Sequence, residues 1–328
     1  MLERARGERD LYALVERYFE SSFVTDNELI TEAIRRMLAA GGKRLRPRIA
    51  LLAAEAAGAR AEDHLRLAAF MELIHVATLI HDDVVDNART RRGVNATAVD
   101  FGNRISVLAG DYLFAWIFKN VTASYAHPIP HVLSSTLADI TDGEVLQLRA
   151  LADLDTALPA YVEIASKKTA SLFAASAECG VLAAGGSPFA VKALRDYGTA
   201  FGIAFQMRDD LLDLTADAAT LGKPVGNDLR ERKMTVPLIL ALAGGDREFR
   251  TAVERFFAQD DDAPESVASV VAGIAAQGGL ARTEAVLAGY VERAKQSLAP
   301  LGTAPARTEL AALADALLST GDPNVLTH

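Results

Sequence analysis

The chain has 328 residues, of which 50% are hydrophobic, and its formal net charge is −9. This length and composition are ample for a large buried core. Because nucleic-acid phosphates demand a basic protein surface, the acidic balance disfavours nucleic acid as a partner. The single cysteine, Cys179, excludes an internal disulfide and a thiolate metal cluster, and we expect it to be a small residue of the core.

The sequence shows no targeting or membrane signal. Residues 1–20 carry alternating charges without an apolar centre, which is unlike a secretory signal, and their acidic residues are unlike an organellar transit peptide. No run of about 18 or more apolar residues continues without a charge or a break, so no integral membrane segment is expected. A cytoplasmic protein is the simplest expectation.

Helix-forming residues recur at three- and four-residue spacings, and alternating β-branched runs are few, which predicts an all-α protein. Thr25 and Asp26 are expected to cap the second helix, which Gly41 ends. No linker rich in Gly, Ser or Pro separates two halves, so one domain over residues 1–328 is expected. The predicted helices cover residues 8–20, 26–40, 43–57, 62–87, 95–101, 104–124, 131–150, 159–183, 187–216, 233–243, 246–258, 264–277, 280–298 and 305–319.

Two acidic clusters of identical spacing fall on predicted helices. Asp82, Asp83 and Asp86 close the apolar helix 62–87, and Asp209, Asp210 and Asp213 close the helix 187–216. Residues four apart share a helix face, so each cluster gathers like charges on a mostly apolar helix, which is destabilising unless a cation neutralises them. Mg²⁺ prefers oxygen ligands and usually takes one or two carboxylates together with substrate phosphates. The pair of clusters therefore predicts a Mg²⁺-diphosphate site.

Cationic side chains that could hold the remaining phosphate oxygens occur in several short motifs. One such acidic cluster alone would usually be a solvated helix face, and GGKRLRP alone a helix entry with exposed charge, but together and in this order they indicate a site. The candidates are Lys43, Arg44, Arg46, Arg91, Arg92, Lys167, Lys168, Lys223, Arg232 and Lys233.

These motifs resemble those of the trans-isoprenyl diphosphate synthases, the head-to-tail prenyltransferases. The resemblance extends over about two thirds of the chain, with the most similar context in long-chain polyprenyl diphosphate synthases. It implies an isoprenoid synthase fold, a bundle of roughly 10–14 helices around a central cavity, and a homodimer. The motifs are GGKRLRP (41–47), IHVATLIHDDVVDNARTRRG (74–93), GDYLF (110–114), KKTASLF (167–173), GIAFQMRDDLLD (202–213) and LGKPVGNDLRERKMTVPL (221–238).

The resemblance also implies roles for individual residues. The ligands of about three Mg²⁺ ions per active site would be Asp82, Asp83, Asp86, Asp209 and Asp213. Asp210 would be a supporting carboxylate, and it counts with these aspartates and Lys168 as catalytic. The residues that bind the allylic diphosphate or line the reacting centre would be Arg91, Lys168, Thr169, Gln206, Lys223 and Lys233. Isopentenyl diphosphate would be bound by Lys43, Arg46, His75 and Arg92.

One departure from the family pattern is Arg232, where many members have glycine before the last lysine. This leaves open which of Arg232 and Lys233 meets phosphate, and the K-x-T-x-P context favours Lys233. Metal ions and cations would stabilise the leaving diphosphate, which is thought to take the released proton itself. No Ser/His/Asp or Cys/His arrangement is therefore needed, and we expect His81, His127 and His131 to be structural.

The residues before the first cluster are expected to set product length. Ala77 and Thr78 are small where short-chain synthases usually carry a bulky aromatic, so we expect an open tunnel and a product of about C30–C50. A deeper floor could be formed by Phe114, Trp116 or Phe118, although these aromatics are more often ordinary core. Such a long product suggests transient membrane contact during its release.

Three alternatives remain open at this stage. A short-chain farnesyl or geranylgeranyl synthase would need a tunnel that is blocked further down. A cyclase or head-to-head synthase is disfavoured by GGKRLRP and RRG, which serve a second, homoallylic diphosphate. A non-catalytic subunit of a heteromeric synthase is disfavoured because both aspartate clusters are intact.

Overall fold

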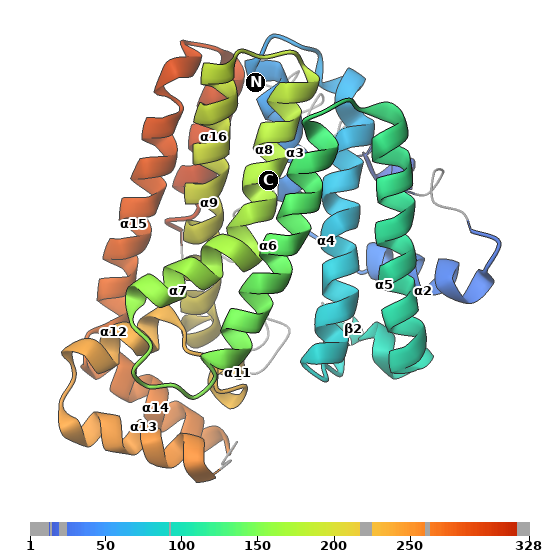
Figure 1. The fold of residues 1–328 in the computed structure, drawn as a ribbon. Helices are drawn as coiled ribbons and strands as arrows, with labels where there is room; N and C mark the ends of the chain where they lie inside the picture. Colours follow the sequence, from blue (N-terminus) through green and yellow to red (C-terminus); the bar gives the residue numbers. More distant parts are fainter. Residues whose placement is uncertain are drawn as a thin grey trace. The chain divides into compact units, whose positions relative to one another are not determined.

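The computed structural model describes residues 13, 15–19, 25–91, 93–216, 225–259 and 263–319. Over these ranges the chain is almost entirely helical, which confirms the predicted all-α class (Figure 1). The exception is a short antiparallel ladder between β1 (Thr90–Arg91) and β2 (Val94–Asn95), with Arg91 opposite Val94. No helix within the described ranges is both long enough and apolar enough to span a bilayer.

Most helix bounds lie within a few residues of those predicted. The short helices α11 and η3 and the β1–β2 ladder were not predicted, and the first turn of the predicted helix 62–87 is the separate 3-10 helix η1. The helices are α2 (Glu28–Ala39), α3 (Leu45–Ala56), η1 (Ala61–His64), α4 (Leu65–Val85), α5 (Thr97–Ser124), α6 (Ile129–Arg149), α7 (Leu158–Ala165), η2 (Ser166–Ala170), α8 (Ser171–Ala183), α9 (Pro188–Thr215), α11 (Asn227–Arg230), α12 (Val236–Gly244), α13 (Arg247–Gln259), α14 (Pro264–Ala276), α15 (Gly279–Ser297), η3 (Ala299–Leu301) and α16 (Pro305–Ala316).

Three local features refine the predicted elements. The break expected between residues 101 and 104 is present, because Gly102 adopts φ 77° inside α5. The predicted helix 159–183 is continuous but contains η2, a π-helical turn at Ser166–Ala170. The cap of α2 is Asn27, whose side chain accepts from the Ile30 N–H, so the expected caps Thr25 and Asp26 were wrong by one or two residues.

The chain divides into two compact units. The first comprises residues 1–134, 175–195 and 300–309, and the second residues 135–174, 196–299 and 310–328. All of the divisions except that between residues 299 and 300 fall within predicted helices, and the expected single-domain organisation stays a prediction.

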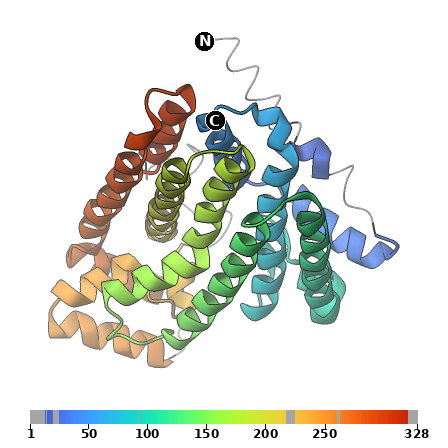
Figure 2. The ribbon, with the colours of Figure 1, turned by 45° about the horizontal axis from the view of Figure 1, so that its top comes forward.

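The first unit is built around α4, which is buried over most of its length because its residues are apolar nearly all round. Helices α3 and α5 pack against it (Figures 1 and 2). The Phe70 ring on α4 meets Trp116 of α5 edge-on at 6.0 Å. Cys179 on α8 is fully buried, as predicted. The histidines 127 and 131 are exposed and stack on each other, so they belong to the surface.

The second unit packs α12 against α14, α15 and α7. Close helix approaches require glycine here, because a Cβ on Gly202 would lie 2.4 Å from the Ala170 Cα. The Tyr197 hydroxyl on α9 donates to the Leu310 carbonyl of α16 over 2.8 Å. These contacts fix α9 and the π-helical turn, the two elements that carry the polar motifs of this unit.

Candidate active-site residues

The first aspartate cluster ends α4. Asp86 caps the helix, and its N–H donates to the Asp82 carbonyl over 2.8 Å. Asp82 and Asp86 are half-buried, whereas Asp83 is fully buried. The β1–β2 turn brings Arg91 back to the helix end, where Nε and Nη2 lie 2.7 and 2.6 Å from Asp83 Oδ1. Arg91 thus neutralises the inward carboxylate, while Asp82 and Asp86 keep part of their surface towards solvent. Arg92 lies outside the described residues.

His81, next to this cluster, has a structural role as predicted. Its Nε2 lies 3.0 Å from the Val107 carbonyl of α5, and its ring meets Phe114 edge-on. A Cβ on Gly110 would lie 2.2 Å from the same ring nitrogen. The glycine of GDYLF therefore makes room for the histidine that precedes the aspartates.

The GGKRLRP motif separates its cations by burial. Lys43 and Arg46 are half-buried, but the Arg44 side chain is buried and bonded within the protein. Arg44 donates to Glu72 of α4 over 2.9 Å and to Glu16 over 2.6 Å. Burial opposes the charge of Arg44, yet the two carboxylates raise the pKa of its guanidinium above the ordinary value. Arg44 is thus an internal ion-pair partner, which removes it from the candidate phosphate ligands.

The remaining residues predicted for the first unit lie on α4. His75 is half-buried, and its carbonyl accepts from the Thr78 hydroxyl over 2.8 Å. Ala77 is fully buried, and Thr78 is half-buried. Phe114 is half-buried, packed against His81.

The second aspartate cluster lies near the C-terminal end of α9. Asp209 is half-buried, and Asp210 and Asp213 are buried. Asp210 accepts from Gln206 Nε2 over 3.0 Å and from the Val236 N–H at the start of α12 over 3.2 Å. Burial raises the pKa of Asp210 to about 6, although both hydrogen bonds lower it. Asp210 is therefore an internal carboxylate bonded to α12 and to its own helix, and its supporting role stays a prediction.

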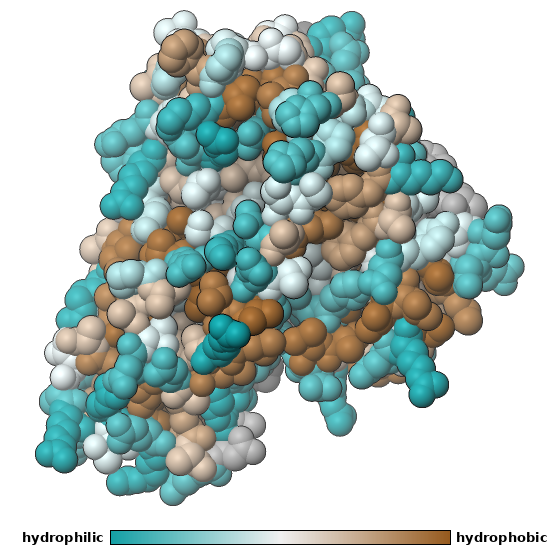
Figure 3. All heavy atoms as spheres, viewed as in Figure 1, coloured by the Kyte–Doolittle hydropathy of each residue, from teal (hydrophilic) through white to brown (hydrophobic). Residues whose placement is uncertain are grey.

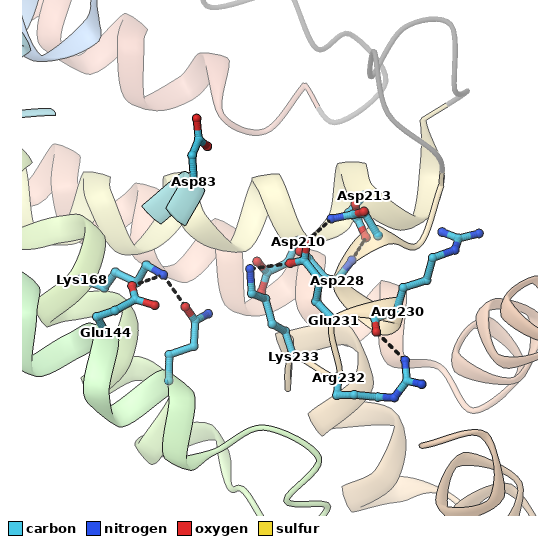
Figure 4. Close-up of polar contacts among 12 residues, drawn as sticks. Asp83, Glu144, Lys168, Asp210, Asp213, Asp228, Arg230, Glu231, Arg232 and Lys233 are labelled. Carbon is cyan, nitrogen blue, oxygen red and sulfur yellow. Dashed lines mark hydrogen bonds and ion pairs between the residues drawn. The ribbon is translucent and has the colours of Figure 1, made fainter. Parts of the chain in front are cut away.

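The Asp213 carboxylate, like that of Asp210, accepts a hydrogen bond from a backbone N–H. Its Oδ2 accepts the Asp228 N–H of α11 over 3.1 Å, and its backbone carbonyl accepts the Gly226 N–H over 2.8 Å (Figure 4). The carboxylate thus holds the chain that returns after the segment 217–224. Lys223, a predicted diphosphate ligand, lies in that segment and outside the described residues.

The π-helical turn joins two of the predicted polar residues to α9. Thr169 donates to Gln206 Oε1 over 2.8 Å, and Gln206 in turn donates to Asp210. This places Thr169, Gln206 and Asp210 in one hydrogen-bonded chain. A π-helical turn inside an α-helix is frequent at functional sites, because it displaces side chains from the regular helix face.

Lys168 on the same turn pairs with two residues of α6 that the sequence analysis did not single out. Its Nζ contacts Glu144 and donates to Gln147 Oε1 (Figure 4). Gly143 allows this approach, because a Cβ there would lie 2.4 Å from the Lys168 backbone nitrogen. The available signal was a glycine followed by Glu144 and, three residues later, Gln147 on a predicted helix.

The two adjacent cations after α11 point to different partners. Arg232 adopts φ 59°, and its guanidinium lies over the rings of Phe256 at 5.5 Å and Phe257 at 6.0 Å. The Lys233 Nζ lies 2.5 Å from Glu231 Oε2. A positive φ explains why glycine suits position 232, and the contacts assign Arg232 to α13. Lys233 instead lies beside Glu231, the residue that directly follows α11 (Figure 4).

The donor chemistry of both clusters fits a hard divalent cation. Within the described ranges, no three His, Cys, Asp or Glu side chains come together as a complete metal cage. Mg²⁺ needs no such cage, because it keeps waters and takes substrate phosphates beside one or two carboxylates. The half-buried Asp82, Asp86 and Asp209 supply oxygens of this kind.

Comparison with known proteins identifies relatives over most of the chain. The family model described as polyprenyl synthetase matches residues 27–274. The octaprenyl diphosphate synthase of Escherichia coli K12 is 43% identical over 235 residues, which are 70% of this chain and 73% of that protein. The short chain isoprenyl diphosphate synthase of Methanothermobacter thermautotrophicus is 36% identical over 92% of this chain and 94% of its own length.

A solved structure of a polyprenyl synthase is also similar to this chain in its three-dimensional fold. The polyprenyl synthase from Caulobacter crescentus, in complex with calcium and isoprenyl diphosphate, is similar with a TM-score of 0.91. The two chains are 38% identical, and the alignment covers 96% of each. The similarity thus includes the fold as well as the motifs.

Proposed function

Since this chain belongs to the polyprenyl synthetase family, we propose that it condenses isopentenyl diphosphate with an allylic diphosphate primer in Mg²⁺-dependent, head-to-tail trans elongation. The enzyme class, a prenyl diphosphate synthase, follows from the relatives. The proposed product is a long-chain polyprenyl diphosphate of about C30–C50.

The observation that carries the proposal is a pattern that both aspartate clusters share. In each, the middle aspartate is buried and stabilised by protein donors: Arg91 for Asp83, and the Gln206 amide with a backbone N–H for Asp210. The first aspartate of each, Asp82 or Asp209, is only half-buried. Such an arrangement fixes the helix end from within and leaves an outer carboxylate for a metal ion.

Different residues are proposed to bind the allylic diphosphate, to hold the metal ions and to line the reacting centre. We propose that Arg91, Lys168, Lys223 and Lys233 bind the allylic diphosphate and stabilise the charge that develops as its C–O bond breaks. Bound Mg²⁺ would supply further charge neutralisation of the leaving group. The half-buried Asp82, Asp86 and Asp209 would be its outer ligands, and the buried Asp83 and Asp213 would complete the two clusters behind them. Thr169 and Gln206, already hydrogen-bonded to each other, would line the reacting centre.

The second substrate is assigned to the first unit. We propose that isopentenyl diphosphate is held by Lys43, Arg46, His75 and Arg92, so that its alkene faces the allylic carbon.

Two of the lysines proposed for the allylic diphosphate already contact carboxylates. Lys168 pairs with Glu144 and Lys233 with Glu231, so both ammonium groups lie within reach of anionic oxygens. A diphosphate, with more charge than one carboxylate, would compete for them.

Product length is the finer part of the proposal. The relatives include both an octaprenyl and a short-chain synthase, so the similarity alone leaves the length open. Ala77 and Thr78, one turn before Asp82, are small, and this supports a long product. The alternative is a short-chain synthase whose tunnel ends at another residue, such as Phe114.

Product analysis tests the proposal directly. Purified protein is incubated with Mg²⁺, isopentenyl diphosphate and either geranyl, farnesyl or geranylgeranyl diphosphate, and the products are separated by chromatography. We expect an all-trans polyprenyl diphosphate of about C30–C50. A C15 or C20 end product would establish the short-chain alternative. Wild-type protein without any turnover, unaffected by adding a partner subunit, would contradict the assignment as a synthase.

Two substitutions separate an active enzyme from a non-catalytic subunit. Asp82→Ala and Asp209→Ala should each reduce turnover by at least about 10³-fold, because each removes a proposed metal ligand. A scaffold subunit would be unaffected by either change. Circular dichroism of both variants controls for folding.

We also propose a homodimer that acts in the cytoplasm and contacts the membrane transiently when it releases product. Exposed Val99, Val107 and Leu108 on α5 support the dimer, because such apolar side chains are typical of subunit contacts. Figure 3 shows brown, hydrophobic side chains among the teal ones on the side of the first unit where α5 lies. Light scattering would test the assembly, and Leu108→Glu should favour the monomer. Cell fractionation would test the location.

A further inference from the structure

The buried arginine of GGKRLRP contacts three separate segments of the first unit. Arg44 Nε donates to Glu16 on the helical segment 15–19, and Nη1 donates to Glu72 on α4. Nη2 donates to the Leu38 carbonyl in the last turn of α2 over 3.0 Å. The guanidinium also lies 5.4 Å from the centre of the Phe19 ring. Each guanidinium nitrogen therefore bonds within the protein, so Arg44 has a different role from its neighbours.

The backbone of Arg44 is as unusual as its side chain. It adopts φ 46° and ψ 36°, a left-handed conformation, directly before α3 begins at Leu45. A residue with a Cβ pays of the order of 1 kcal/mol to adopt it, so it persists only where the surroundings determine it. The ion pairs with Glu16 and Glu72 are that determinant, and they fix the turn on which Lys43 and Arg46 are presented.

The partner Glu72 extends this effect to a second proposed ligand. Glu72 is 2% exposed, so it is an internal carboxylate whose charge needs Arg44. It lies three residues before His75 on α4, a spacing that places the two residues side by side on the helix. The Arg44–Glu72 pair therefore couples the loop of Lys43 and Arg46 to the helical turn that carries His75.

We propose that Arg44 and Glu72 are positioning residues for isopentenyl diphosphate: their ion pair sets the spacing of Lys43, Arg46 and His75. The inference rests on the proposed function, and it assigns the effect of this ion pair to one of the two substrates, isopentenyl diphosphate. It predicts that weakening the pair impairs isopentenyl diphosphate binding and leaves the allylic diphosphate unaffected.

The test uses conservative substitutions in the full-length chain. Arg44→Lys keeps a cation for Glu72 but loses the fork that reaches three acceptors, and Glu72→Gln keeps an acceptor but loses the charge. We expect either variant to raise the KM for isopentenyl diphosphate, and its Kd by calorimetry without primer, about tenfold. The KM for the allylic primer should stay within about twofold of wild type.

A matched control distinguishes positioning from general stability. Arg36→Lys alters an arginine of α2 whose ion pair with Asp100, at 2.7 Å, is exposed, and it should leave both KM values unchanged. Two results would overturn the inference, provided that the wild-type protein still elongates. One is an equal rise of both KM values in Arg44→Lys and Glu72→Gln. The other is an unchanged Kd for isopentenyl diphosphate in both of these variants. Wild-type protein that neither binds nor elongates isopentenyl diphosphate would instead refute the proposed function.

Discussion

Replacing Gly143 with alanine should disable the enzyme through a single methyl group. Gly143 lies inside α6, and a Cβ there would be 2.4 Å from the Lys168 nitrogen, 2.8 Å from its Cα and 2.9 Å from its Cβ. Two of the three contacts are backbone, which cannot rotate away. Since ordinary contact begins at 3.4 Å, the π-helical turn must move by about 1 Å relative to α6.

A displacement of this size predicts how much catalytic efficiency and how much folding stability the variant loses. A shift of about 1 Å in a substrate-positioning group costs about 100-fold in rate, so we expect kcat/KM to fall by about that factor. Overpacking costs about 1–3 kcal/mol of the free energy of unfolding, and the better helix propensity of alanine returns about 1 kcal/mol. Gly143→Ala should therefore fold with a modest loss of stability and a large loss of activity.

Steady-state kinetics with both substrates and urea unfolding provide the measurements. Gly289→Ala is the matched control, because this residue lies within α15 and a Cβ there meets no atom within 4 Å. It should gain about 0.5–1 kcal/mol of stability with unchanged kinetics. If Gly143→Ala kept kcat/KM within about twofold of wild type, the assignment of Lys168 to the diphosphate would be refuted.

Four further outcomes follow from the structure. Chelation by EDTA should abolish elongation and Mg²⁺ should restore it; persistent activity would contradict the metal assignment. Ala77→Phe should shorten the product, and an unchanged product would contradict the chain-length assignment. Arg232→Gly should change the free energy of unfolding by no more than about 1 kcal/mol, because glycine relieves the strain of φ 59° and this offsets the lost contacts to Phe256 and Phe257. The variant should remain active; an inactive variant would indicate that Arg232 binds phosphate. Burial raises the pKa of Cys179, so iodoacetamide should modify only unfolded protein at about pH 8, and rapid native labelling would contradict its burial.

Local patterns in the sequence predicted the elements well. Helix bounds follow from apolar periodicity and from glycine, and both signals operate within a few residues of chain. The break at Gly102 and the continuous stretch that contains α7, η2 and α8 were found in this way. The cap of α2 and the short helix α11 were missed, because adjacent polar residues offer several possible caps and one helical turn has no periodicity.

The sequence by itself determined the family, the two aspartate clusters and the set of cations around them, because motif order and spacing are properties of the chain. Only the tertiary structure decided which partner each of these cations meets. Arg44 meets a glutamate 28 residues away, Lys168 meets Gln147 21 residues earlier, and Arg232 turns to α13 while Lys233 does not. Ion pairs depend on distances between segments, and burial decides which carboxylate needs one. Neither quantity is set by the order of residues alone.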